Sequence, residues 1–463
     1  VAMAGTYYWP QQKGDVNRTG YSPHVVQSDL TAEPTWVWKD PNFDVVRSTP
    51  LIDDKKNIYL GTQSGRMYKF SPDGSILWTY RSTRGNTPAA PSIMDGSLYL
   101  NTLYGFVVAL DMETGRERWA TQISHLTTSD GACVFALNKT IITATQQTPG
   151  GPSNNAVVAL SDDGARRWTF NLQWPTFNFQ ASSPGDGTVV FQDHFGGLYR
   201  LGLDDGHLIW ESGIRDRLPH FFTTGAAVCG PDGLVYVASN YGDVGLIHAY
   251  RLENGELVWY REFDMPVHQA VAFGMLAGSD KPAVVAGIGE SAGYPYVSRF
   301  DSWNLPEWLG SLINRASIWA AGKPTWFWGT KVLPAALVAL EAETGETRWW
   351  YTPPPFTRPS SEGEELYLVR RLEAQGQHPE YVIEVICLPC SFGQAVIGGD
   401  GVTYAGHLDG KLYAVKDENG NGQIEEHEVS THYFGHAFQG SQGIAPGMLA
   451  VAPCGSGLYV WKS

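Results

Sequence analysis

A run of oxygen-bearing side chains near the end of the chain has the spacing of a calcium site. Residues 417–428 read Asp-Glu-Asn-Gly-Asn-Gly-Gln-Ile-Glu-Glu-His-Glu, which matches the twelve-residue calcium loop at its key positions. A glycine at the sixth position permits the sharp bend, and the last glutamate can close the site with two oxygens. The predicted calcium ligands are Asp417, Asn419, Asn421, the backbone carbonyl of Gln423, Glu425 through a water molecule, and Glu428.

The loop follows a strand at 411–416, so it need not lie between two helices. Two of its ligands are asparagines, which gives the loop less negative charge than a high-affinity sensor would carry. We therefore expect a structural calcium ion in a calcium-rich compartment, against the alternative of an unoccupied acidic turn.

Other chemical candidates are weaker. Gly289-Glu-Ser291-Ala-Gly293 has the form of a serine-hydrolase nucleophile elbow, which needs a strand, a strained turn and a helix. Pro295 follows closely and opposes that helix, so a coincidence in a loop is the better interpretation. His427, His432 and His436 have gaps that would suit metal ligands on a helix, but the segment around them reads as a strand. The sequence therefore predicts no catalytic residues.

A repeated strand phrase organises the chain that must position these groups. A strand, a small-residue turn and a second strand occupy 58–70 and again 98–110. Repeats of such length are single supersecondary units that bury a core only by stacking on their neighbours. Copies of the second strand end at Phe70, Leu110, Leu160, Leu201, Tyr250, Leu340, Val415 and Trp461.

The other half of the repeat is a turn glycine followed by a tryptophan. Glycine supplies the positive φ of the hairpin, and the Asp, Glu or Asn that usually precedes it caps the turn. We expect the indole ring to cover the seam with a neighbouring blade. The pairs are Gly74/Trp78, Gly115/Trp119, Gly164/Trp168, Gly206/Trp210, Gly255/Trp259 and Gly345/Trp349.

The two ends of the chain complete one another. The strand at 457–462 ends without a glycine–tryptophan turn, and Pro34-Thr-Trp-Val-Trp38 reads as an outer strand with no partner before it. Trp38 precedes Trp78 by about 40 residues, which fits the repeat. The sequence thus predicts an all-β fold, with residues 1–463 forming one eight-bladed β-propeller domain of four-stranded antiparallel blades. The N-terminal strand closes the last blade.

The repeat phrase resembles that of the pyrroloquinoline-quinone-like propellers, and residues 9–23 resemble the N-terminal segment of that superfamily. Its members include quinone-dependent alcohol dehydrogenases and a bacterial outer-membrane assembly lipoprotein without a cofactor. The resemblance therefore implies a fold more specifically than a function.

The quinone-binding features that this resemblance implies are absent from the sequence. In the enzymes the quinone lies in the central funnel, held by calcium and a disulfide between adjacent cysteines, with an aspartate as base. No two of the five cysteines here are adjacent, no aspartate matches by motif, and the predicted calcium loop is peripheral. The sequence argues against bound pyrroloquinoline quinone.

Three segments exceed what a blade needs, at about 291–330, 353–389 and the calcium loop. The first, here called the Trp-rich insertion, contains an amphipathic pattern at 306–321 that predicts a helix packed on the propeller. The alternative is a lid or a docking surface for a protein partner, because aromatic side chains make good interface anchors. The candidate partner-binding residues are Trp303, Trp308, Trp319, Trp326 and Trp328.

Charge and composition narrow the function further. The formal net charge of −15 argues against binding to nucleic acid or anionic lipid. No apolar run approaches the roughly 20 residues of a membrane-spanning helix. Ala2-Met3-Ala4 resembles a signal-peptidase site, and the sequons at Asn17 and Asn138 would suit a secreted glycoprotein. Cys387-Leu-Pro-Cys390 is interpreted as a structural disulfide or as two unpaired thiols.

These observations predict an exported propeller, either secreted or in an organelle lumen or the periplasm. We expect it to be stabilised by calcium and to act as a non-catalytic binding or assembly scaffold. A protein partner would bind its blade loops or the Trp-rich insertion. The alternatives are a quinone-dependent dehydrogenase of alcohols or sugars and a structural subunit of an extracellular assembly.

Overall fold

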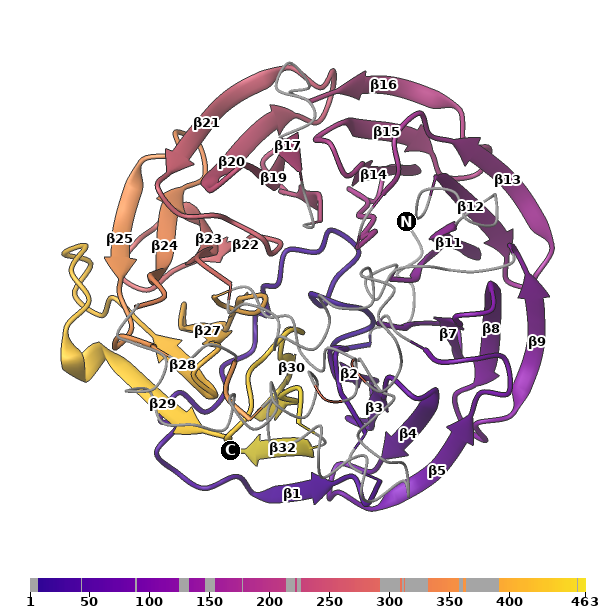
Figure 1. Ribbon diagram of the computed structural model, residues 1–463, viewed down its shortest axis with the longest axis horizontal. Helices are drawn as coiled ribbons and strands as arrows, with labels where there is room; N and C mark the ends of the chain where they lie inside the picture. The colour runs from indigo at the N-terminus through magenta and orange to yellow at the C-terminus, as the bar shows by residue number, and fades with distance from the viewer. Residues whose placement is uncertain are drawn as a thin grey trace.

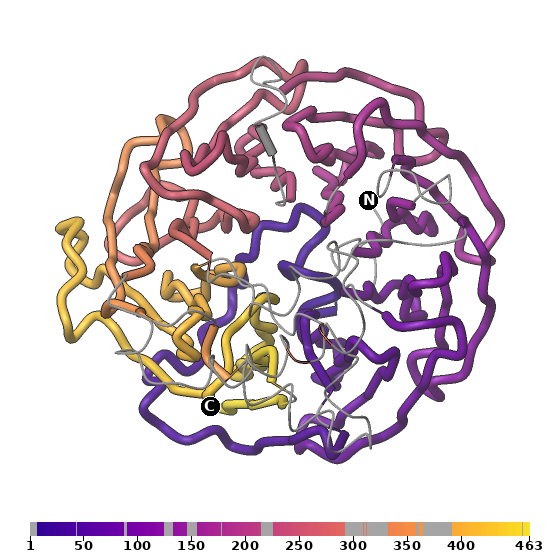
Figure 2. Tube along the Cα trace, viewed as in Figure 1, coloured from indigo at the N-terminus to yellow at the C-terminus, as the bar shows by residue number. Residues whose placement is uncertain are grey.

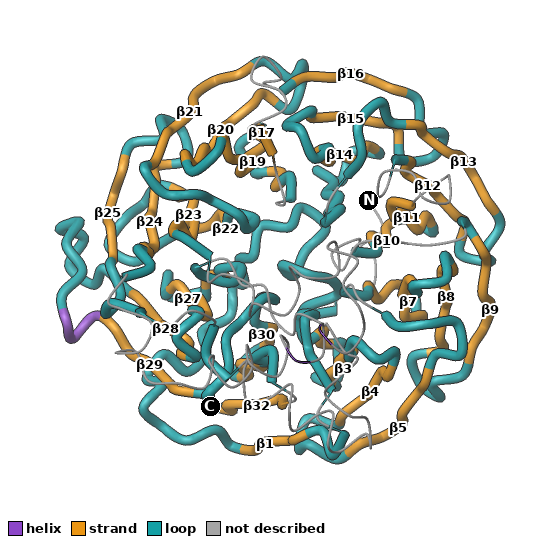
Figure 3. Tube along the Cα trace, in the orientation of Figure 1, coloured by secondary structure: helices purple, strands orange, loops and turns teal. Residues whose placement is uncertain are grey.

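Eight sheets stand radially around a central axis in the computed structural model (Figure 1). Strands and loops make up nearly all of the part that is described (Figure 3). The predicted all-β, eight-bladed propeller is confirmed. The structure describes residues 7–42, 44–87, 90–124, 133–145, 155–176, 178–213, 221–222, 226–291, 309, 312, 332–357, 361–363, 391–455 and 457–463.

Five of the blades are regular meanders of four strands in chain order. Blade 1 contains β2 (Leu51–Ile52), β3 (Ile58–Gly61), β4 (Arg66–Phe70) and β5 (Ile76–Arg81). Blade 2 contains β6 (Ser92–Met94), β7 (Ser97–Asn101), β8 (Phe106–Asp111) and β9 (Glu117–Gln122). Blade 3 contains β10 (Phe135–Leu137), β11 (Thr140–Thr145), β12 (Ala156–Ser161) and β13 (Arg166–Asn171). Blade 6 contains β22 (Ala272–Met275), β23 (Pro282–Gly289), β24 (Ala335–Glu341) and β25 (Thr347–Tyr351). Blade 7 contains β26 (Val396–Ile397), β27 (Thr403–Gly406), β28 (Lys411–Val415) and β29 (Val429–Tyr433).

Two blades depart from this pattern at their innermost position. In blade 4, an isolated bridge from Ser182 to Val190 stands before a three-stranded sheet. In blade 5, two short strands both pair with the next strand. Blade 4 contains β14 (Thr188–Gln192), β15 (Leu198–Gly202) and β16 (Leu208–Ser212). Blade 5 contains β17 (Phe221–Phe222), β18 (Val228–Cys229), β19 (Leu234–Tyr241), β20 (Val244–Arg251) and β21 (Leu257–Phe263).

Blade 8 joins the two ends of the chain, as predicted. It contains β30 (Gly443–Ala445), β31 (Met448–Val451), β32 (Gly457–Lys462) and, as its outer strand, β1 (Trp36–Lys39). Closure in this way leaves the ring without a gap between its first and last blades.

The tryptophan that closes the ring is Trp36, not the Trp38 that the repeat spacing indicated. Trp36 pairs with Val460, and its Nε1 donates to the carbonyl of Pro72 at 2.9 Å. Trp38 also faces blade 1, where its ring contacts those of Tyr68 and Phe70, and the Trp36 ring contacts Phe70 as well. The spacing did not separate the two tryptophans, because β1 has no hairpin turn before it and no turn glycine fixes which of them donates across the seam.

The expected tryptophan seams are also present between successive blades from blade 1 to blade 6. Trp78 Nε1 donates to Met112 O at 3.0 Å, and a Cβ placed on Gly115 would come within 2.7 Å of the Trp78 ring. Each indole thus lies on the turn glycine of the next blade. The same donation to a backbone carbonyl of the next blade occurs at Trp119, Trp168, Trp210 and Trp259.

The N-terminal segment, residues 9–24, crosses the middle of the ring before it reaches β1 (Figures 1 and 2). Its backbone hydrogen-bonds to the innermost part of most blades in turn. The bonded pairs are Trp9 with Ile52, Pro10 with Ile93, Val16 with Ser183, Asn17 with Cys229, Thr19 with Phe273, and Gly20 and Ser22 with Ile397.

Candidate functional site

The predicted calcium loop connects β28 to β29 and projects from the rim of the ring beside β25 (Figure 1). It ends in a short 3-10 helix, η3 (Glu426–Glu428), which is the purple segment at the rim in Figure 3. The loop therefore lies away from the axis, as the sequence predicted.

Backbone amides hold the two terminal carboxylates of this loop in place. Asp417 is buried, and its carboxylate accepts from Asn421 N at 3.1 Å and Gly422 N at 3.0 Å. Glu428 accepts from Glu418 N at 2.7 Å and Glu425 N at 2.9 Å. These amide donors lower the pKa of Glu428, so its carboxylate stays charged.

Backbone amides also orient the predicted ligands in the middle of the loop. Asn419 Oδ1 accepts from Asn421 N at 2.9 Å, and Asn421 Oδ1 accepts from Gln423 N at 2.7 Å. Gly422 has a φ of +79°, which favours glycine at the bend. The donor set consists of carboxylate, amide and backbone oxygens, and such hard ligands fit Ca²⁺.

The three neighbouring histidines are not arranged as a metal site. His427 Nδ1 lies 3.4 Å from Glu425 Oε2, and His432 Nδ1 lies 3.1 Å from the carbonyl oxygen of Leu30. Within the part of the chain that the structure describes, no three His, Cys, Asp or Glu side chains gather as the ligands of a metal ion would.

The loop docks on the neighbouring blade. Gln423 forms a parallel bridge with Trp350 of β25. A Cβ on Gly422 would lie 2.6 Å from Arg348 O, and one on Gly278 would lie 2.7 Å from Gly420 Cα. A loop that belongs to blade 7 thus rests on blade 6 through close backbone contacts.

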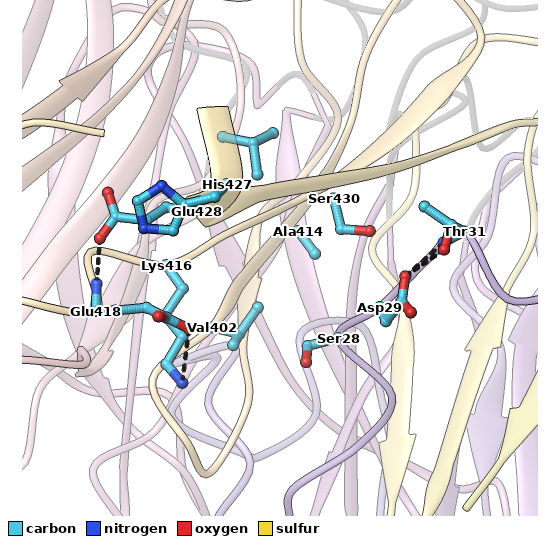
Figure 4. Close-up of a pocket in the computed structure, with 11 residues that line it drawn as sticks. Ser28, Asp29, Thr31, Val402, Ala414, Lys416, Glu418, His427, Glu428 and Ser430 are labelled. Carbon is cyan, nitrogen blue, oxygen red and sulfur yellow. Dashed lines mark hydrogen bonds and ion pairs between the residues drawn. The ribbon is translucent and has the colours of Figure 1, made fainter. Parts of the chain in front are cut away.

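A pocket of about 310 Å³ adjoins the loop (Figure 4). The loop and η3 form one wall, with Lys416 Nζ 3.8 Å from a Glu418 oxygen. Residues 28–31 form the other wall, where the amide of Leu30 donates to Ser430 Oγ at 2.8 Å. The pocket therefore joins the loop to the stretch that leads into β1.

Two basic side chains of the N-terminal segment are buried in the middle of the ring. Lys13 Nζ donates to Val271 O at 2.7 Å and Ala395 O at 2.9 Å, and burial lowers its pKa to about 7. Arg18 is fully buried, and its guanidinium donates to the carbonyls of Ala181 and Gln12. Sequence reasoning used this segment only as a family signature and missed its position, because nothing in its pattern marks these residues as buried.

A chain of amides also lies at the centre. Gln12 Nε2 donates to Gln394 Oε1 at 2.8 Å, and Gln394 Nε2 donates to Gln180 Oε1 at 3.2 Å. Cys133 Sγ donates to Gln12 Oε1 at 2.6 Å. Amide groups position ligands by hydrogen bonding, but they are not the side chains that general acid–base catalysis uses.

The remaining predicted residues are scattered. Asn138 is exposed in the β10–β11 turn, whereas Asn17 is half-buried beside the fully buried Arg18. Ser291 is exposed just beyond β23.

The five tryptophans of the Trp-rich insertion lie outside the described residues. Leu309 and Leu312, the two residues of residues 292–331 that are described, are both helical. Cys387 and Cys390 also lie outside, while Cys454 is disulfide-bonded and Cys229 is a buried thiol. None of the helices that the structure describes is long and apolar enough to cross a membrane.

A protein-family model described as outer membrane protein assembly factor BamB matches residues 17–147 and 63–220. Together with the closed ring of eight blades, this match confirms the resemblance found in the repeats. The chain is an eight-bladed β-propeller, and its repeats resemble those of the pyrroloquinoline-quinone-like propellers.

Relatives of this propeller include both assembly factors and an enzyme. BamB of Yersinia pestis is 24% identical over 225 residues, which cover 37% of this chain and 56% of that protein. BamB of Moranella endobia is 22% identical over 264 residues, covering 45% and 67%. The quinoprotein alcohol dehydrogenase PedH of Pseudomonas putida is 24% identical over 286 residues, covering 58% and 39%. The chain thus spans about half the length of the first of these relatives.

Solved structures share the fold at low identity. BamB from Moraxella catarrhalis has a TM-score of 0.59 at 16% identity, covering 93% of this chain and 99% of that one. A europium-containing methanol dehydrogenase has a TM-score of 0.66 at 12% identity, covering 98% of each chain. BamB and a methanol dehydrogenase match this chain comparably, so the likeness concerns the propeller fold and not its function.

Proposed function

We propose that the chain is an exported, calcium-stabilised propeller that acts as a non-catalytic binding or assembly scaffold. The observation that carries this proposal is the match of residues 17–220 to the BamB model. Proteins named as outer membrane protein assembly factors are also among its relatives. The protein partner would bind the blade loops or the Trp-rich insertion.

Two observations support the non-catalytic part of the proposal. The described side chains at the centre include a chain of amides and two buried cations that donate to backbone carbonyls. The sequence also lacks the adjacent cysteines that its resemblance to quinone enzymes would imply.

Export is supported by the disulfide at Cys454, because disulfides persist in oxidising compartments.

The scaffold function is tested by capture from the native host. The full chain, isolated with calcium present after chemical cross-linking, should bring one protein in fixed stoichiometry. As a parallel assay, the chain is mixed with pyrroloquinoline quinone and calcium and supplied with alcohols or sugars and an electron-accepting dye. A quinone absorption band with dye reduction would overturn the proposal in favour of a dehydrogenase. A polymeric native protein that captures nothing else would favour a structural subunit.

The calcium part is tested by titration of the metal-stripped chain with Ca²⁺ in a calorimeter. We expect one bound ion per chain, and loss of binding in Glu428→Gln, because Glu428 supplies the closing carboxylate. Glu426→Gln is the matched control, since Glu426 is exposed in the same short helix and is not a predicted ligand. Equal binding by the wild type and Glu428→Gln would contradict the proposed site.

A further inference from the structure

A second cavity, of about 430 Å³, lies beside the N-terminal segment. Its walls come from that segment, from the turn between β18 and β19 in blade 5, and from β22 and β23 in blade 6. It is therefore built by three stretches of chain that only the closed ring brings together. None of its lining residues belongs to the calcium loop.

One part of the lining is apolar and aromatic. It is supplied by Tyr21, Phe273 and Met275. The Tyr21 ring lies against Gly274, where a Cβ would come within 2.7 Å of the ring. Phe273 is buried, whereas Met275 is 37% exposed and can meet an incoming group.

The other part of the lining is acidic. Asp15 and Asp232 both line the cavity, and none of the residues described as lining it is Lys, Arg or His. Asp15 accepts from Thr19 N at 2.9 Å and Thr19 Oγ1 at 2.5 Å, and Asp232 accepts from Tyr236 Oη at 2.6 Å. A carboxylate has about four lone-pair sites, so both groups can accept further hydrogen bonds.

No described cation lines the acidic part, although Lys13 and Arg18 are charged neighbours of Asp15. Both cations donate to backbone carbonyls. Burial raises the pKa of Asp15. A cation placed in the cavity would favour the charged form of its carboxylate.

We propose that this cavity binds an arginine side chain of a partner protein. Its planar guanidinium can donate to Asp15 and Asp232 while one face lies on the Tyr21 ring. Its alkyl stem matches Phe273 and Met275. The inference rests on the proposed scaffold function, since it names the chemistry of the partner. Asn17 also lines the cavity, so a glycan on its sequon would compete with the arginine.

The test uses the full chain with Asn17 unmodified and methionine methyl groups labelled with ¹³C. Met275→Leu identifies the Met275 signal. The probe is N-acetyl-arginine amide, and N-acetyl-citrulline amide is its neutral isostere. We expect the Met275 methyl resonance to shift saturably with the arginine probe and to stay in place with the citrulline probe. An unmoved resonance, or equal shifts with both probes, would overturn the proposal. An equal response to N-acetyl-leucine amide would overturn it in favour of an apolar guest.

A pair of variants locates the binding. Asp232→Asn should raise the dissociation constant of the arginine probe about five- to tenfold, because a charge-assisted hydrogen bond becomes a neutral one. Asp54→Asn makes the same charge change at an exposed turn of blade 1 and should leave the constant unchanged. Equal effects of the two variants would contradict the site. Failure here is distinguishable from failure of the scaffold function, because partner capture is measured without the probe.

Discussion

The indole ring of Trp36 lies over Gly74 and so joins the last blade to the first. A Cβ on Gly74 would come within 2.8 Å of Trp36 Cδ2, and Gly74 has a φ of +87°. The glycine is needed twice over, for the turn conformation and for the close approach of the ring. Because blade 8 contains both ends of the chain, this one contact helps to close the propeller.

Gly74→Ala should therefore lower the free energy of unfolding by about 2–5 kcal/mol. About 1–2 kcal/mol comes from the left-handed backbone conformation, and the remainder from overpacking against the indole. Urea denaturation measures the loss. Gly185→Ala is the matched control, because Gly185 has a φ of +85° and no atom within 4 Å of a built Cβ. It should cost only about 1–2 kcal/mol, and equal losses would show that the indole contact contributes nothing.

The blades could be predicted from the sequence because the residues that define each hairpin lie close together in the chain. A turn glycine and a tryptophan lie within one hairpin, so their spacing is fixed by the turn. Trp36 shows where this reasoning ends, since β1 has no such turn and pairs with a strand from the other end of the chain.

At the candidate site, too, the sequence predicted the local features and missed those that depend on packing between blades. The predicted calcium ligands lie in one continuous loop, so their spacing alone was enough to propose them. The docking of that loop on Arg348 and Gly278 could not, because it depends on how blades 6 and 7 meet. Lys13 and Arg18 look like surface residues in the sequence, and their burial follows only from the closed ring.

Lys13 should make stability depend on pH. Its pKa is lowered from 10.5 to about 7, so between these values the unfolded chain binds more protons than the folded one. The contribution of Lys13 to the free energy of unfolding then rises with pH, by at most about 1.4 kcal/mol per pH unit. The difference between wild type and Lys13→Met, measured by urea denaturation from pH 7.5 to 9.5, should increase accordingly. Parallel curves for the two proteins would contradict this burial effect.

Removal of calcium should loosen the seam between blades 6 and 7, if the loop binds the ion as proposed. Gln423 is itself a predicted ligand through its carbonyl and pairs with Trp350 of β25, so disorder in the loop would expose that strand. Hydrogen exchange at 347–351 should become faster after chelation, while exchange at 76–81 in β5 should not change. Equal acceleration in both strands would indicate general destabilisation and not local stabilisation of the contact between blades 6 and 7.

Deletion of residues 300–329 tests whether the Trp-rich insertion binds a partner. The described flanks of the insertion, β23 and β24, pair with each other along their length, so the shortened chain should keep its circular dichroism spectrum. Partner capture from the host should be lost. Unfolding of the shortened chain would mean that the insertion belongs to the core, and unchanged capture would assign the interface to the blade loops.

Cys229 should report on whether the N-terminal segment is docked. Its amide donates to Asn17 O, and burial raises the pKa of its thiol to about 12. Only the thiolate is an effective nucleophile, so a thiol reagent at pH 8 should label Cys229 slowly in the native chain and rapidly in urea. Arg18→Met removes the hydrogen bonds to Ala181 O and Gln12 O and should speed labelling in the absence of urea. If this variant is labelled no faster than the wild type, Arg18 does not hold the segment against blades 4 and 5.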